Sequence, residues 1–206
     1  MPLLDALLAA SAVLLALALR PWRGLAGGAL PWPALAWWAC LPVLWSLDRF
    51  AGISLLQPLS GSCLLMLMLG WPLTMLMLVP VTLLMSLGAE MSALDALQRA
   101  VWLGVVPATL AMLLGAALRR WVPRHLFVYI LGRGFFITAL SVGAAGAAAA
   151  LLNGVPVGLD ADDVMLARGL AAWGDAFLTG GLVAIFVAFR PEWLATYADR
   201  IYLPRT

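Results

Sequence analysis

The sequence predicts an all-α integral membrane protein, a bundle of about seven transmembrane helices with the amino terminus outside and the carboxyl terminus inside. Three observations predict it. Of the 206 residues, 65% are hydrophobic and 11% charged, whereas a soluble domain is about half apolar and about a quarter charged. The apolar residues form runs close to the ~20 residues that cross a bilayer. Arginine is concentrated in alternate loops between those runs.

The first four runs are separated by charges and turn residues. The first is kept as a span rather than a signal peptide, because it lacks a basic leader and a small-x-small cleavage site. Prolines in the second predict a kinked helix. Pro58 and Gly61 interrupt the start of the third, so we expect its first turns to be unwound. Gly70-Trp71-Pro72 predicts a tight turn, because proline starts a helix well. These runs cover residues 3–19, 30–47, 53–69 and 72–87.

Three longer runs complete the predicted bundle. A polar loop over 88–98 precedes the fifth run, and an acidic loop over 153–163 separates the sixth, rich in alanine and glycine, from the seventh. Arg190-Pro191 ends the seventh run and opens a short cytoplasmic tail, 190–206. The whole chain is thus one membrane domain, and the last three runs cover residues 100–118, 126–152 and 164–189.

The distribution of arginine gives the orientation. With the amino terminus outside, the external segments hold Arg49 and Arg99 beside most of the acids, as the positive-inside rule requires. Arg168, just inside the seventh run, is on the wrong side for this rule, but it lies beside three acids. Merging the third and fourth runs into a re-entrant hairpin would keep the same orientation. The arginines form no patch, so we expect no nucleic-acid partner. The internal arginines are Arg20, Arg23, Arg119, Arg120, Arg124, Arg190, Arg200 and Arg205.

Ionisable residues inside the bilayer are functional candidates, because a charge there costs ~2.5 kcal/mol or more. Asp175, near the middle of the seventh run, is expected to face the interior and to have a partner. It is either a functional residue, as a cation ligand, a coupling site or a helix-breaking polar anchor, or a structural hydrogen-bond acceptor between helices. Arg133 either reaches the inner surface or pairs with Asp175. His125 is the sole histidine, and we expect an interfacial anchor or partner contact.

Soft ligands are a further possibility. Cys63 and Met66 are three residues apart and share a helix face. Thiolate and thioether groups favour Cu(I), but methionine also fills gaps in cores. Hydrolase triads, phosphate-binding loops and HExxH motifs are absent from the sequence, so we expect neither an enzyme nor a cofactor.

Three stretches resemble bacterial energy-coupling factor transporter permeases. They are residues 121–130 with Gly134-Phe135-Phe136, the turn Leu69-Gly-Trp-Pro72, and residues 190–203 at the carboxyl end. The resemblance is to the substrate-specific membrane component of cobalt and nickel uptake systems, and it covers most of the chain from about Ile53. It implies a seven-helix fold in the bacterial inner membrane, a transition-metal cation as substrate, and partners: a membrane coupling subunit and ATPase subunits.

The metal ligands of that family are only partly present. The chain begins Met1-Pro2-Leu3 where the relatives begin Met-His, and residues 57–61 hold no histidine. Asp175 falls where the relatives have an acidic residue, and Gln57 is a candidate neutral replacement ligand.

Three functions therefore stay open. The first is a substrate-binding permease component for a transition-metal cation or small solute, with Asp175 and Gln57 at the site. The second is a non-transporting scaffold or assembly factor that docks a partner through Arg119, Arg120, Arg124, His125 and the tail. The third is a copper transporter that uses Cys63 and Met66.

Overall fold

The computed structural model describes residues 2–23, 31–52, 56–123, 125–155, 158–198 and 202. All regular structure in these ranges is helical, which confirms the all-α class. The α-helices are α1 (Pro2–Ala18), α2 (Trp32–Trp45), α3 (Leu47–Ala51), α4 (Ser62–Leu69), α5 (Trp71–Gly88), α6 (Ala93–Arg99), α7 (Val106–Trp121), α8 (Ile137–Asn153) and α9 (Ala161–Phe189). Short 3-10 helices are η1 (Pro21–Arg23) and η5 (Pro191–Trp193), and π-helical segments are η3 (Ala100–Val105) and η4 (Val128–Phe136).

Four of the described helices are long and apolar enough to cross a membrane, so the chain is a membrane protein. They cover Trp71–Gly88, Ala93–Trp121, Val128–Asn153 and Ala161–Phe189, over the fourth to the seventh predicted runs. Helix α1 is apolar but shorter. The count of seven spans and the sidedness of the termini stay predictions.

The third predicted run, 53–69, is helical only in its second half. Residues 56–61 are not helical, as Pro58 and Gly61 indicate, and α4 has 8 residues, which is about 12 Å of helix. All eight of its side chains are buried, in contact with α2, α5, α7 and α9. Residues 53–55 lie outside the described part of the chain. The bundle therefore surrounds a short apolar helix that is preceded by a non-helical segment.

The predicted polar loop at 88–98 is wrong in its second half, because α6 begins at Ala93. The Ser92 hydroxyl accepts the N–H of Asp95 at 3.1 Å, and this cap satisfies an otherwise free donor of the first turn. Helix α6 then continues through η3 into α7, so the fifth predicted run, 100–118, lies within a helix of 29 residues. The second run, 30–47, differs as well: α2 ends at Trp45 and α3 follows after Ser46.

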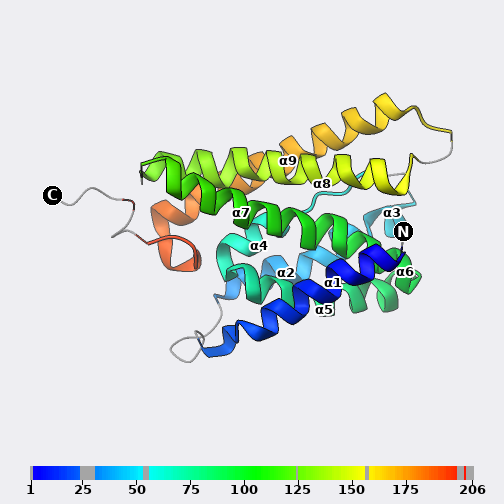
Figure 1. The fold of residues 1–206 in the computed structure, drawn as a ribbon, viewed down its shortest axis with the longest axis horizontal. Coiled ribbons are helices and arrows are strands. Elements are labelled where there is room, and N and C mark those ends of the chain that lie inside the picture. Colours follow the sequence, from blue (N-terminus) through cyan, green and yellow to red (C-terminus); the bar gives the residue numbers. More distant parts are fainter. Residues whose placement is uncertain are drawn as a thin grey trace.

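The connections separate to the two ends of the bundle. In Figure 1 the first residues of α1, together with α3, α6, the end of α8 and the start of α9, lie at the right-hand end. The carboxyl-terminal segment after α9 lies at the left. The segments that the sequence assigns to the outside thus share one end, here called the outer end after that prediction.

The carboxyl-terminal segment packs against the bundle, whereas the sequence predicted a tail available for docking. The N–H groups of Ala195 and Thr196 donate to the carbonyls of Met68 and Leu67 at 3.2 and 3.3 Å. These carbonyls belong to the last turn of α4 and have no partner within it. Leu194 is also buried. In its described part, 190–198, the segment is therefore a cap for α4.

Candidate functional site

Asp175 of α9 holds the broken end of α4 in place. Its two carboxylate oxygens accept the backbone N–H groups of Ser60 and Gly61 at 2.7 and 2.9 Å. The side chain is 1% exposed, so the predicted interior position with a partner is confirmed. A carboxylate suits this place because the first N–H groups of a helix lack intrahelical acceptors and carry partial positive charge. Asp175 is therefore a structural acceptor between helices.

Two tryptophans of α2 complete the same junction, and sequence reasoning missed both. The indole N–H of Trp45 donates to the Ser60 carbonyl at 2.9 Å, and that of Trp37 donates to the Gly61 carbonyl at 2.9 Å. Gly61 has a φ of +62°, and a Cβ there would lie 2.9 Å from the Trp37 ring. A signal for them was available in the sequence. Buried indole N–H groups need acceptors, and the free carbonyl groups of an unwound segment provide such acceptors.

The π-helical segment η3 contributes a third contact. The Ser60 hydroxyl donates to the carbonyl of Leu103 at 2.6 Å. A π-helical turn shifts the i→i−4 bonding register, and such turns are frequent at functional sites. Residues 60–61 are thus held from α2, η3 and α9 together.

A cavity of about 450 Å³ opens at the outer end, and the non-helical segment before α4 forms part of its lining. The volume is in the range of small-molecule sites. The sequence-predicted Gln57 lines it, whereas Asp175 does not. Its polar lining residues are Arg49, Gln57, Asp95, Gln98, Arg99, Asn153 and Arg168, and its apolar ones include Leu56, Pro58, Trp102, Leu103 and Val155.

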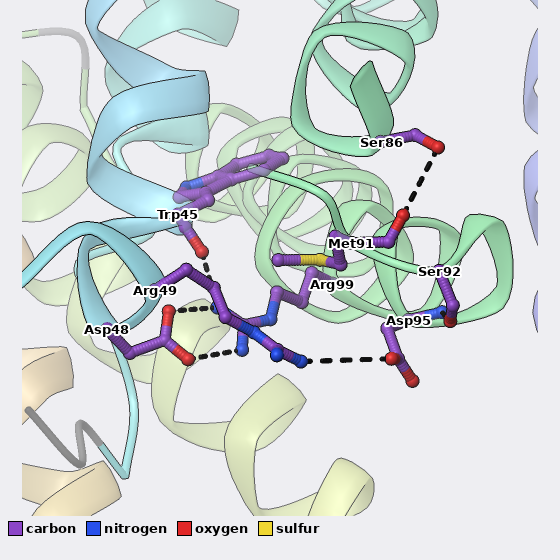
Figure 2. A network of polar contacts seen from close by, with 8 residues as sticks. All are labelled: Trp45, Asp48, Arg49, Ser86, Met91, Ser92, Asp95 and Arg99. Carbon is purple, nitrogen blue, oxygen red and sulfur yellow. Dashed lines mark hydrogen bonds and ion pairs between the residues drawn. The ribbon is translucent and has the colours of Figure 1, made fainter. Parts of the chain in front are cut away.

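A polar network lies at α3 and α6 (Figure 2), and three of its residues, Arg49, Asp95 and Arg99, line this cavity. Arg99 donates to both carboxylate oxygens of Asp48 at 2.7 and 2.6 Å, and to the Trp45 carbonyl at 2.5 Å. Arg49 faces Asp95 at 4.0 Å, with both side chains about half exposed. The bidentate Asp48–Arg99 pair fixes α3 against α6. The Arg49–Asp95 pair is weak, as exposed ion pairs generally are.

The Asp48–Arg99 pair predicts a pH dependence of stability. The hydrogen bonds from Arg99 hold the pKa of the Asp48 carboxyl below its ordinary value of 3.8. A lowered folded-state pKa contributes stability that is complete above the unfolded-state pKa and is lost as pH falls through the folded-state pKa. We expect Asp48→Asn to cost about 1 kcal/mol at neutral pH and to remove this part of the acid sensitivity. Thermal unfolding in detergent between neutral pH and pH ~3 measures both effects; a parallel loss in wild type and variant would contradict them.

Arg168 and Gln57, which also line the cavity, meet at Gly146. An Arg168 guanidinium nitrogen, Nη1, donates to the Gly146 carbonyl. A Cβ on Gly146 would lie 2.9 Å from the Gln57 side-chain oxygen. Only glycine lets α8 approach both side chains so closely. The sequence placed Arg168 beside the acids that open the seventh run, but within the described residues no carboxylate lies in ion-pair distance of it.

A buried acid near the amino terminus also escaped the sequence analysis. Asp5 of α1 is 2% exposed and accepts the indole N–H of Trp102 at 2.9 Å. Trp102 lines the cavity, so this bond fixes one of its walls. The available signal was an acid within the first apolar run.

The other sequence candidates lie away from the cavity. Cys63 and Met66 are buried in the core on α4, and the Cys63 thiol contacts the Pro107 carbonyl at 3.8 Å. Arg133 is 4% exposed and lies over the Tyr129 ring, 5.9 Å from its centroid. The possible pair between Arg133 and Asp175 does not form, since Asp175 is bonded at the α4 junction.

The predicted docking face is partly described. Arg119 and Arg120 are exposed at the end of α7. His125 is exposed, and its ring stacks on Phe127 with 5.6 Å between centroids. Arg124 lies outside the described residues. The three described side chains are accessible for a partner, and their role stays a prediction.

Among the described residues, no group of three or more His, Cys, Asp or Glu side chains gathers into a possible metal site. A metal site built on Asp175 and Gln57 stays a prediction.

Comparison of the chain with protein-family models, with curated proteins and with solved structures gives no match in any of the three. The resemblance to energy-coupling factor permeases stays a prediction from sequence, and function has to be argued from the cavity.

Proposed function

We propose that this chain is the solute-binding component of a membrane transport system and that its substrate enters the outer-end cavity. The observation that carries the proposal is a cavity of about 450 Å³ at the outer end of an apolar bundle, lined in part by the non-helical segment that precedes the buried helix α4. Irregular backbone is tolerated at membrane depth where it is buried in protein or lines a cavity. Many transporters bind their substrates at such interrupted helices.

The location and partners belong to the same proposal. The chain acts in the bacterial inner membrane, with a membrane coupling subunit and ATPase subunits as the source of energy. Arg119, Arg120 and His125 form the exposed face on which such a partner docks. A transition-metal cation is the substrate that the resemblance suggests. Asp175 is a poor ligand for it, because both of its oxygens already accept backbone N–H groups.

A matched pair of glycine variants on α8 tests the proposal. Gly146→Ala places a methyl group 2.9 Å from the Gln57 side chain and displaces it into the cavity. Gly143→Ala meets only the Ala172 methyl group at 3.6 Å, an ordinary contact. We expect solutes that raise the melting temperature of the purified protein to bind at least fivefold more weakly to Gly146→Ala and normally to Gly143→Ala.

The screen covers Co(II), Ni(II), Cu(I) and Zn(II) beside small organic acids, amides and amines, and uptake of every binder is then measured in cells that express the chain. If none binds and none is taken up, the transport proposal fails and the scaffold function is favoured. Binding that is equal in the two glycine variants would place the site elsewhere. Cu(I) uptake that is lost in Cys63→Ser would favour the soft-metal function.

A further inference from the structure

One of the guanidinium groups that line the cavity has no carboxylate partner among the described residues. Three guanidinium groups line it, those of Arg49, Arg99 and Arg168, together with the carboxylate of Asp95. Arg99 forms an ion pair with Asp48, with 2.6 Å between guanidinium nitrogen and carboxylate oxygen. Arg49 faces the carboxylate of Asp95. Arg168 is left without a carboxylate in ion-pair distance among the described residues.

Arg168 has hydrogen-bonding capacity that the described part of the protein does not use. Its Nη1 donates to the Gly146 carbonyl, but its Nε is buried without an acceptor among the described residues. Arg168 is the eighth residue of α9, a helix long and apolar enough to cross a membrane, where an unpaired charge is unfavourable. A bound anion would supply the missing acceptor and the counter-charge together.

The rest of the lining defines the size and polarity of that anion. Amide groups of Gln57, Gln98 and Asn153 line the cavity together with apolar surface from Trp102 and Leu103. The volume greatly exceeds that of a bare ion and suits a small organic molecule. A single unpaired guanidinium complements a monoanion, and its planar group matches a carboxylate by two parallel hydrogen bonds.

We infer that the cavity binds a small organic monocarboxylate, with its carboxylate on Arg168 and its apolar part against Trp102 and Leu103. This inference rests on the proposed function, since it names the substrate class of the same cavity. It replaces the cation that the sequence resemblance suggests with an anion.

Three near-isosteric probes test the charge requirement. Phenylacetate, phenylacetamide and phenethylamine share an aromatic ring and differ in charge, and their affinities for the detergent-purified protein are measured by isothermal titration. We expect phenylacetate to bind at least tenfold more tightly than the other two. Equal or tighter binding of the amide or the amine would overturn the inference.

Substitutions of Arg168 test the assigned residue. Arg168→Gln should weaken phenylacetate binding at least tenfold, and Arg168→Lys, which keeps the charge without the planar fork, should lie between. Arg190→Gln makes the same change of charge at an exposed arginine paired with Glu192, remote from the cavity, and should leave affinity unchanged. If Arg168→Gln does not fold, the comparison of Arg168→Lys with the wild type tests the assignment in its place.

The outcomes separate this inference from the proposed function. If probes bind and Gly146→Ala weakens them while the Arg168 variants do not, the solute-binding function stands and the carboxylate assignment falls. If no probe binds at millimolar concentration, the carboxylate assignment also falls, and the wider screen with uptake decides the proposed function.

Discussion

Asp175→Ala should destabilise the protein by roughly 2–6 kcal/mol, since it leaves two buried backbone N–H groups without an acceptor at about 1–3 kcal/mol each. Ser60 is fully buried and the Gly61 N–H faces the same carboxylate, so water does not replace the lost oxygens. Within an apolar bundle, an unpaired N–H is costly. The measurement is thermal unfolding in a mild detergent, followed by far-ultraviolet circular dichroism.

Two further variants show whether the effect of Asp175→Ala comes from the lost hydrogen-bond acceptors. Asp175→Asn keeps one acceptor oxygen but turns an amide N–H₂ towards a backbone donor, so its stability should fall between those of wild type and Asp175→Ala. Asp162→Ala removes an exposed acid from the first turn of the same helix and should change stability by less than about 1 kcal/mol. An unchanged melting temperature for Asp175→Ala would show that the carboxylate does not hold α4.

The same series bears on function. If Asp175 were a metal ligand rather than a structural acceptor, Asp175→Asn would abolish metal binding at a temperature where the protein is still folded. If it is the acceptor described above, loss of stability accompanies any loss of binding. Both quantities should therefore be measured on the same preparation.

Trp45→Ala has the second large expected effect, a loss of about 3–5 kcal/mol. The side chain is completely buried, and a Cβ built on Gly104 would lie 2.9 Å from its ring, so η3 packs directly on it. Its N–H donates to Ser60, while its carbonyl accepts Arg99 (Figure 2). Removing the ring leaves a void between α2, η3 and the start of α4.

Trp45→Phe separates the contribution of packing to this loss of stability from the contribution of the hydrogen bond. Phenylalanine keeps most of the volume but leaves the Ser60 carbonyl without its indole donor, which should cost about 1–3 kcal/mol. Trp32→Ala, an exposed tryptophan of the same helix, is the control and should cost less than about 1 kcal/mol. Thermal unfolding of all three variants gives the comparison. Similar melting temperatures for Trp45→Ala and Trp32→Ala would rule out the proposed packing role.

The candidate site was only partly predictable from the sequence. Asp175 and Gln57 were recognisable because a buried acid and a broken helix start are local features. The tryptophans and Leu103 were not, since they matter through contacts from other helices. Arg168 was assigned to the neighbouring acids by sequence proximity, whereas the structure turns it towards Gly146.

The sequence by itself determined that the chain is a helical membrane protein, where most apolar runs begin and end, and that the third run is interrupted. Composition and the positions of proline, glycine and charge control these properties through local energetics. Tertiary structure alone decided which groups satisfy the broken backbone and which charges remain unpaired. Residues 60 and 175 are far apart along the chain, and a hydrogen bond between them depends on helix packing, for which single-residue patterns give no signal. The change of the expected ligand from cation to anion has the same origin, because Asp48 and Asp95 neutralise two arginines only once α3 and α6 meet.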